Sequence, residues 1–395
     1  MSSSNQVRVA FIEESTYGIT PGAGNFNTAR FTSDSLSGSP DTTESQQIRT
    51  DRLSSGQVVT GLAIEGDLNY ELAKEDALDL LFKSAMYQSA YTTDTPISVD
   101  LTIDATAKTI TRASGDWDVD ALLGDVVTLA GFTAPTDNTQ VMIASIDSAL
   151  IISYIGKDDL VDEAGSGTSF VVADKLDIGT TKVSFSMEKA FLDLTTKAIN
   201  YLGMIVSGFN INAAYGSIVS GSFTFMGNGY NTADTAGEFI TDSRTINAAA
   251  TTQSLNGSVD MPFVGSSATG TFEASTFCIQ SVEITVNNNL TVQNCIGRIA
   301  PFDYTDGTCQ IEVSLSAYLA DGNWAQLAAK LEQTPFALGF VLKNDDGFYG
   351  FYLPAVQVNM DDPVAAGINQ DIILTMTGTA KVGASGESAL TVFKG

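Results

Sequence analysis

The feature of the sequence that most constrains its fold is a strict alternation of apolar and polar residues that passes directly into a helical pattern. From Leu62 to Leu72 the even positions are apolar or glycine and the odd positions are Ala63, Glu65, Asp67, Asn69 and Glu71. This period of two predicts a strand with one face in a core and the other in water. From Lys74 to Met86 the apolar spacing becomes helical, and acids occupy the first turn, where the helix dipole favours them. We therefore expect a mainly β chain with a helix packed on a sheet.

The same strand-to-helix pattern occurs again in the C-terminal third. The odd positions from Gln310 to Leu319 are apolar, and Asn323–Leu331 has helical spacing. At an offset of 247 the two patterns align without a gap, and Tyr201–Ile205 similarly resembles Tyr352–Val356. The aligned pairs include Ile64 with Ile311, Glu65 with Glu312, Leu68 with Leu315 and Leu80 with Leu327. The sequence thus predicts two tandem copies of one β domain, each with one packed helix.

The first copy contains an insertion. Leu72 to Tyr201 spans 129 positions, whereas Leu319 to Tyr352 spans 33. Between about Thr95 and Thr180, short β-branched runs alternate with Gly, Asp and Asn turns, which predicts a small all-β barrel or sandwich. The expected domains are residues 1–94 with 181–227, an inserted domain at 95–180, a linker at 228–256, and a second copy at 257–395.

A polar stretch from Gly38 to Gly61 is too long for an ordinary hairpin turn and holds almost no core residues. Such a segment is expected to project from the domain as an arm or functional loop.

The composition excludes much of enzyme chemistry. The 395 residues include no histidine, so a Ser-His-Asp triad, a Cys-His pair and His-ligated zinc are excluded. The three cysteines are too far apart for a C-x-x-C site. Asp116–Asp120 resembles the start of a calcium loop, but Ala121 and Val127 replace the required Gly and Glu. Paired carboxylates could serve a glycosidase, yet nothing selects a pair. We expect no enzyme, catalytic residue, cofactor or metal.

The charge balance argues against a nucleic-acid-binding surface. Lys and Arg number 19 against 46 Asp and Glu, a net charge of −27, and affinity for nucleic acid comes chiefly from basic residues. Charged residues are only 16% and apolar residues 44%, so the chain should fold with large cores. No apolar run approaches the roughly 20 residues of a membrane span, and no membrane association is expected.

Several segments resemble the tail tube proteins of long-tailed, non-contractile (siphovirus-type) bacteriophages. They are Glu13–Pro21, Phe31–Leu36, Ile48–Arg52 and Glu65–Leu72 running into a helix. Asp116-Trp117, Gly124–Phe132 and Asp137-Asn138 resemble the accessory β domain often inserted in that family. The resemblance covers most of the chain and implies a virion protein, made in the host cytoplasm, whose stacked rings form the hollow tail tube through which DNA passes.

The family resemblance also implies partners. Rings in the family are usually hexamers in which neighbouring inner sheets join into one barrel. With two copies per chain, we predict a trimeric ring with pseudo-six-fold symmetry, with a hexamer as the alternative. The tape measure, tail terminator and distal tail proteins are further expected partners, and phage DNA would occupy the lumen without specific binding.

Two sets of residues are candidates for these roles. Because a carboxylate-lined duct repels phosphate, we expect the lumen to be lined by Glu65, Asp67, Glu71 and Glu312. The ring-stacking arm would use Asp41, Glu44, Arg49, Asp51 and Arg52. The alternative functions are a bacterial surface-layer or pilus-like β-sandwich subunit and, third, a glycan-binding β protein.

Overall fold

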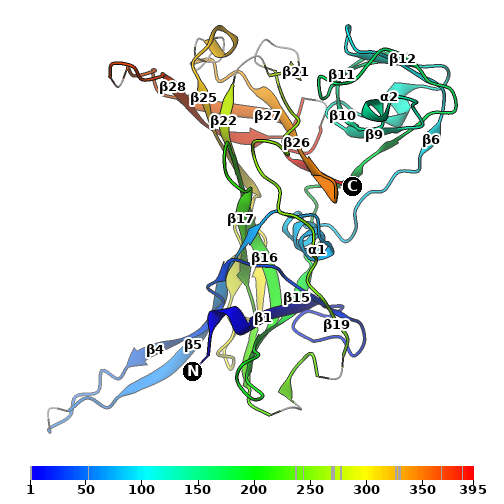
Figure 1. Cartoon of the computed structure of the whole chain (residues 1–395). Coiled ribbons are helices and arrows are strands. Elements are labelled where there is room, and N and C mark those ends of the chain that lie inside the picture. Colours follow the sequence, from blue (N-terminus) through cyan, green and yellow to red (C-terminus); the bar gives the residue numbers. More distant parts are fainter. Residues whose placement is uncertain are drawn as a thin grey trace.

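The computed structural model describes residues 2–51, 53–235, 238–242, 244–267, 272–275, 278–324, 327, 331–365, 367–384 and 386–395 (Figure 1). Strands account for 49% of the residues and helices for 7%, so the prediction of a mainly β fold is confirmed. Two layers of strands enclose the main core, and a separate small β unit packs on one side.

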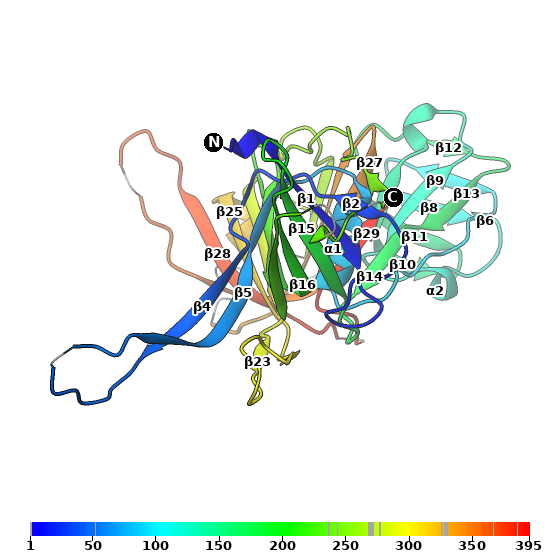
Figure 2. The ribbon, with the colours of Figure 1, turned by 90° about the horizontal axis from the view of Figure 1, so that it is seen from below.

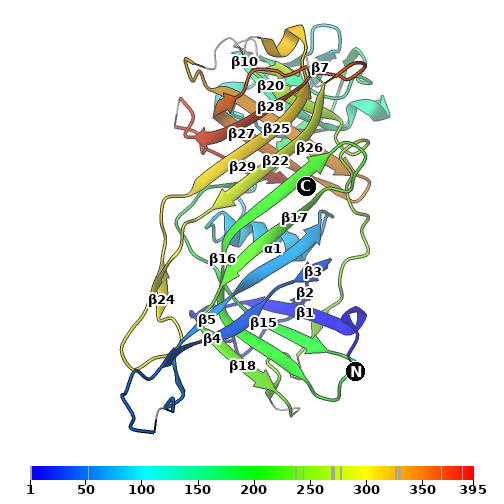
Figure 3. The ribbon, with the colours of Figure 1, turned by 90° about the vertical axis from the view of Figure 1, so that its left-hand side faces the viewer.

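Eight antiparallel strands form one continuous sheet through the whole molecule, which we call the long sheet (Figure 3). In spatial order it contains β4 (Ser37–Glu44), β5 (Gln57–Glu71), β17 (Ser220–Met226), β16 (Ala198–Ala214), β22 (Ile279–Asn287), β25 (Gln310–Tyr318), β28 (Ile373–Lys381) and β27 (Gly347–Met360). The short β3 (Ser33–Asp34) also pairs with β5. The strand that Leu62–Leu72 predicted is therefore part of β5, and the one that Gln310–Leu319 predicted is β25.

The long sheet repeats one four-strand order, first as β4–β5–β17–β16 and then as β22–β25–β28–β27. Glu65 lies opposite Met226, and Glu312 lies opposite Thr379. The same spacing holds three residues on, where Leu68 faces Phe223 and Leu315 faces Met376. The 247-residue offset of the sequence thus recurs in the register of the strands.

Both ends of the molecule carry a second layer of strands behind the long sheet (Figure 1). In the first half it consists of β15 (Ser184–Phe191), β1 (Val7–Glu13), β2 (Phe26–Thr28), β19 (Ile246–Asn247) and β18 (Gly229–Ala233). In the second half it consists of β26 (Phe336–Asn344), β20 (Phe263–Ser266), β21 (Glu273–Ala274), β29 (Thr391–Lys394) and β14 (Asp174–Asp177). β16 pairs with β15 and β27 with β26 at equivalent places, so both halves have the same sandwich plan.

Helix α1 (Asp76–Ala85) lies between the layers where the two halves meet, and it agrees with the helix predicted from Lys74 to Met86. The fully buried Phe82 ring lies 5.2 Å from the Phe223 ring and 5.6 Å from the Tyr349 ring, one from each half. The Asp79 carboxylate accepts hydrogen bonds from Lys74 at 2.6 Å and from the Tyr349 hydroxyl at 2.7 Å. The helix therefore joins the two halves through both apolar and charged contacts.

The second predicted helix, Asn323–Leu331, falls mostly outside the described residues. Its first residue, Asn323, ends the 3-10 turn Asp321–Asn323, and its side chain accepts a hydrogen bond from the Ala320 amide at 2.9 Å. Residues 325–326 and 328–330 lie outside the described residues. Two other 3-10 turns are Ser4–Gln6 and Pro135–Asp137.

The predicted inserted segment forms an eight-stranded sheet of its own. Its strands are β6 (Ile97–Ser98), β7 (Leu101–Asp104), β8 (Thr109–Arg112), β9 (Val126–Ala130), β10 (Gln140–Ser148), β11 (Ile151–Ile155), β12 (Glu163–Ala164) and β13 (Ser169–Val172). They surround a core that contains the fully buried Trp117, at the start of the single turn α2 (Trp117–Asp120). Asp116 caps this turn by accepting a hydrogen bond from the Asp118 amide at 3.0 Å, so the acidic segment is a short helical turn.

This inserted unit packs on the second half of the chain, although it interrupts the first. Met142 and Val126 share a buried cluster with Val341, Phe348 and other residues of the second half. Gly339 makes this contact possible, because a Cβ there would lie 2.5 Å from the Met142 sulfur. The unit lies on the side of the molecule away from the open face of the long sheet (Figures 1 and 2).

Candidate functional site

The central rows of the open face of the long sheet are polar across both halves. Directly opposed residues of an antiparallel sheet point to the same side, so each register row reports one face. One row reads Asn69, Ser222, Asn210, Thr285, Glu312, Thr379 and Gln357, and the next reads Glu71, Ser220, Asn212, Glu283, Ser314, Thr377 and Asn359. The row between them is mostly buried and apolar, with Tyr70, Ile211, Ile284, Val313 and Val358. The polarity pattern is therefore unbroken where the halves meet.

The register of the strands places all four acids that the sequence singled out for a lumen, Glu65, Asp67, Glu71 and Glu312, on this open face. Glu65 and Glu312 are exposed, whereas Asp67 and Glu71 are half-buried. Asp67 accepts a hydrogen bond from the Thr224 hydroxyl at 2.7 Å, and Glu71 accepts one from Ser254 at 3.0 Å. These hydrogen bonds hold two of the carboxylates close to the sheet.

Sequence reasoning missed a further acid, Glu283 on β22, which lies in the same row as Glu71. The signal was available, since Val282, Ile284 and Val286 alternate with Glu283 and Thr285. The eight strands of the long sheet contain a single basic residue, Lys381, against the acids Asp41, Glu44, Glu65, Asp67, Glu71, Glu283 and Glu312. The sheet has a strongly negative balance.

The two halves meet at a regular seam between β16 and β22. Gly208 lies opposite Asn287, and the pairing runs without interruption to Ala214 opposite Ser281. β16 pairs with β15 as far as Ile205, and a bulge around Ser207 separates this pairing from the seam. β22 of the second half thus continues the sheet beyond β16, the edge strand of the first half.

At the two outer edges of the long sheet, β4 and the last residues of β27 have no further strand partner among the described residues. β4 pairs with β5 on one side only. β27 pairs with β26 as far as Val356, after which Asn359 and Met360 have only β28 as a neighbouring strand. An unpaired edge is a template for a strand of another chain.

The predicted arm is the distal part of the β4–β5 hairpin, which projects from the body of the molecule (Figures 1 and 2). Arg49 binds the Asp51 carboxylate of the same arm through two hydrogen bonds, with Nε to Oδ1 at 3.0 Å and Nη2 to Oδ2 at 2.5 Å. The Arg49 guanidinium holds the pKa of Asp51 below its usual value. Glu44 accepts a hydrogen bond from Ser54, so these charged groups are paired within the arm.

Asp41, near the base of the arm, lies on β4 opposite Gly61. Arg52 lies outside the described residues.

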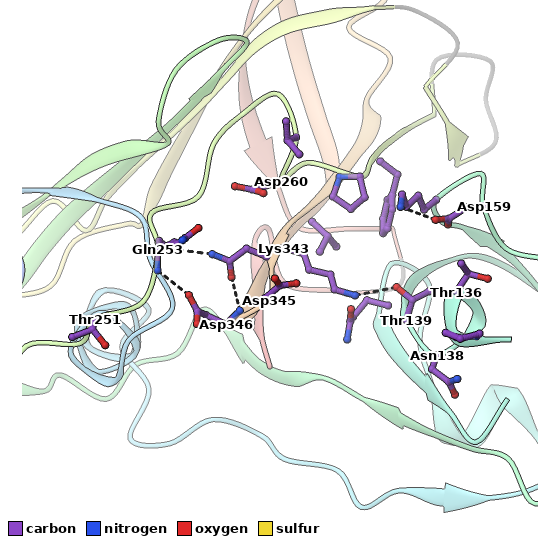
Figure 4. A pocket seen from close by; sticks show the side chains of 18 residues that line it. Thr136, Asn138, Thr139, Asp159, Thr251, Gln253, Asp260, Lys343, Asp345 and Asp346 are labelled. Atoms are coloured by element: carbon purple, nitrogen blue, oxygen red, sulfur yellow. Dashed lines mark hydrogen bonds and ion pairs between the residues drawn. The ribbon is translucent and has the colours of Figure 1, made fainter. Parts of the chain in front are cut away.

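A cavity of about 850 Å³ lies where the inserted unit meets the second half, and its polar lining is largely paired internally (Figure 4). Lys343 donates to the Thr139 hydroxyl at 3.1 Å, and the Gln253 amide donates to Asp346 at 2.8 Å. Burial lowers the pKa of Lys343. The described residues contain no group of His, Cys, Asp and Glu side chains that could hold a metal ion. We therefore interpret the cavity as the space left at the junction between the inserted unit and the second half.

A comparison with known protein families bears on the role of the long sheet. A protein family described as phage tail tube protein matches residues 4–380, nearly the whole chain. No curated protein matches the sequence. Within the described residues, no helix is long and apolar enough to cross a bilayer. The match favours a structural role in the tail over the surface-layer and glycan-binding alternatives, and over an enzymatic role. The chain belongs to the phage tail tube protein family.

Proposed function

We propose that three copies of this chain close into a ring with pseudo-six-fold symmetry, and that stacked rings form the hollow tail tube through which phage DNA passes. The single observation that carries this proposal is the β16–β22 seam, at which the edge strand β22 of the second half pairs with the edge strand β16 of the first. The outer edges of the long sheet are the corresponding edges, β27 and β4. Joining β27 of one chain to β4 of the next would place Asn359 and Met360 where Gly208 and Phe209 lie in the seam. The residues after Met360 would extend β27 on contact, so that the ring closes by the same kind of strand pairing.

The repeat fixes the expected register of this contact between chains. Gly208 corresponds to Asn359, because they face Thr224 and Thr377, which are equivalent positions of β17 and β28. Asn287 corresponds to Ser39, because these residues face Gln310 and Ala63, which the 247-residue offset relates. Since Gly208 lies opposite Asn287, we expect Asn359 of one chain to lie opposite Ser39 of the next.

Cysteine pairing tests this register and the ring size together. In a chain whose natural cysteines are replaced by serine, Asn359→Cys with Ser39→Cys should form disulfides between chains, giving a ladder that ends at a covalent trimer in a denaturing gel. The control Asn359→Cys with Asp41→Cys shifts one partner by two residues on the same face, about 7 Å along the strand, too far for a disulfide. A covalent hexamer, or equal yields from both pairs, would overturn the proposed trimer seam.

The lumen is proposed to be the open face of the long sheet. Its acids repel the DNA backbone, and its Ser, Thr, Asn and Gln side chains offer no dense positive charge to hold phosphate. The inserted unit, on the opposite side, would then lie on the outside of the tube (Figure 2). On this reading the duct conducts DNA because its wall does not bind it.

A further inference from the structure

A second projecting hairpin occupies the same position in the repeat as the β4–β5 arm. It consists of β23 (Thr291–Gln293) and β24 (Asp303–Thr305) and connects β22 to β25. Ser37 faces Glu65 at the base of the first arm, and Thr285 faces Glu312 at the base of the second hairpin. The connection is 28 positions long from Ser37 to Glu65 and 27 positions long from Thr285 to Glu312. The two hairpins are therefore matched in place and in length.

Both hairpins leave the long sheet at the same end of its strands (Figures 2 and 3). The second hairpin is anchored at its base. The buried Tyr304 hydroxyl donates to the Gly227 carbonyl at 2.8 Å, and the Asn288 side chain donates to the Ala85 carbonyl at 3.0 Å. Lys182 adds an ion pair with Asp306 at 3.5 Å. These contacts hold the base of the hairpin against the first half, and the tip residues 295–299 line a groove with Asp41 and residues 60–65 at the base of the first arm.

The tips of both hairpins expose large aliphatic side chains. Ile48 and Ile296 each lie 11 positions beyond the matched residues Ser37 and Thr285, and their relative exposures are 101% and 108%. Leu53 at 66% accompanies Ile48, and Ile299 at 58% accompanies Ile296. Apolar groups exposed together on an anchored hairpin mark a surface that binds another protein.

The opposite end of the long sheet carries exposed apolar residues in two equivalent turns, which connect β16 to β17 and β27 to β28. The β16–β17 turn exposes Tyr215 at 80% and Ile218 at 46%. The β27–β28 connection exposes Val364 at 73% and Ile368 at 91%. Each half of the chain therefore has an apolar tip at one end and an apolar turn at the other.

We infer that the β23–β24 hairpin is a second stacking arm, whose tip binds the apolar turns at the opposite end of another copy of this chain in the adjacent ring. The inference rests on the proposed tube. A contact between opposite ends of identical subunits is head-to-tail and extends without limit along an axis. The Arg298 guanidinium at the tip lies 5.4 Å from the centre of the Phe302 ring, and the exposed Asp361 at the β27–β28 connection of the adjacent ring would offer it a carboxylate. A ring would then present six arms, two from each chain.

The natural Cys295, exposed next to Ile296, allows a direct test. In a chain carrying Cys278→Ser and Cys309→Ser, the rate of maleimide labelling of Cys295 is measured in unassembled subunits and in tubes. We expect labelling to slow at least tenfold in tubes. The control has all three natural cysteines replaced and Val119→Cys on the inserted unit, where labelling should not change. An unchanged Cys295 rate in tubes overturns the second arm.

A matched pair of variants gives an independent readout. Negative-stain microscopy of Ile296→Asp should show rings or short stacks, whereas Val119→Asp, a charge placed on another exposed aliphatic residue, should give tubes of ordinary length. Ordinary tubes from Ile296→Asp, with tubes lost in Ile48→Asp, would assign stacking to the first arm alone and leave the proposed tube intact. An unmodified chain that forms neither rings nor tubes would refute both proposals.

Discussion

At the scale of single residues, the buried acid Glu75 is the most unusual group near the junction of the two halves. It precedes α1 and is only 4% exposed, and neither carboxylate oxygen accepts a hydrogen bond from a described residue. Burial raises its pKa from 4.5 to about 7; Arg30 opposes this shift, and the acids Asp79 and Asp76 add to it. A carboxyl group in this state favours its protonated form in the folded chain.

Glu75 should therefore make stability depend on pH. Its folded pKa exceeds its unfolded pKa, so its contribution is fully present below about pH 4.5 and is lost as the pH rises through about 7. Glu75→Gln should leave the free energy of unfolding near pH 4.5 unchanged and raise it at pH 8, by up to about 3 kcal/mol at 1.4 kcal/mol per pKa unit, and the Tm should rise with it. Calorimetry at both pH values measures this, with Asp94→Asn, an exposed acid that does not contribute to the pKa shift of Glu75, as control. The prediction is wrong if the Tm of Glu75→Gln and the Tm of the unmodified chain change by the same amount between pH 4.5 and pH 8.

At the scale of elements, two adjacent residues of β10 belong to different cores, one within the inserted unit and one between this unit and the second half. Ile143 lies in the core of the unit itself, whereas Met142 lies in the cluster shared with the second half. Both side chains are fully buried. Their strand therefore serves two cores from its two faces.

Truncating each side chain should thus have a different spatial effect. Met142→Ala and Ile143→Ala should each cost about 2–5 kcal/mol, the usual range for such cavities. Hydrogen exchange should rise at β26 and β20 in Met142→Ala, but at β7, β8 and β11 in Ile143→Ala. Equal protection of β26 in the two variants would show that Met142 does not hold the unit against the second half.

At the scale of the whole molecule, the proposed lumen predicts an effect on DNA passage. Glu65→Lys with Glu312→Lys changes the charge of each chain by four units at equivalent places on the open face. Particles with this double variant should assemble tubes and release DNA more slowly, because the new cations bind phosphate. Asp94→Lys with Asp118→Lys makes the same change in total charge at exposed positions off the long sheet and should leave release normal. Ejection at the ordinary rate from the Glu65 and Glu312 variant would rule out this lumen.

The strands and the acidic face were largely predictable from the sequence because both depend on local alternation. The comparison of Tyr201–Ile205 with Tyr352–Val356 was displaced by one residue. Met204 faces Phe185, and Val356 faces Phe336 at the equivalent place in the second half, so Met204 corresponds to Val356, 152 positions later. The extra residue in the bulge around Ser207 then restores the offset of 151, which relates Gly208 to Asn359. A gapless comparison cannot detect one extra residue in a bulge.

The position of the inserted unit could not be predicted, because the cluster around Met142 and Phe348 joins segments about 200 residues apart. No local pattern encodes such a contact. The seam between β16 and β22 was hidden for the same reason, since either strand alone reads as an ordinary alternating strand.

In the proposed ring, the seam within the chain would also limit the errors that assembly can make. Because β16 and β22 belong to one polypeptide, wall segments are delivered only in covalently joined pairs. A closed ring of such chains can hold four, six or eight segments but never five or seven, so the smallest possible error in circumference is two segments rather than one. In the proposed tube, two segments in one chain would therefore restrict the ring to an even number of segments, and so restrict the diameter of the tube.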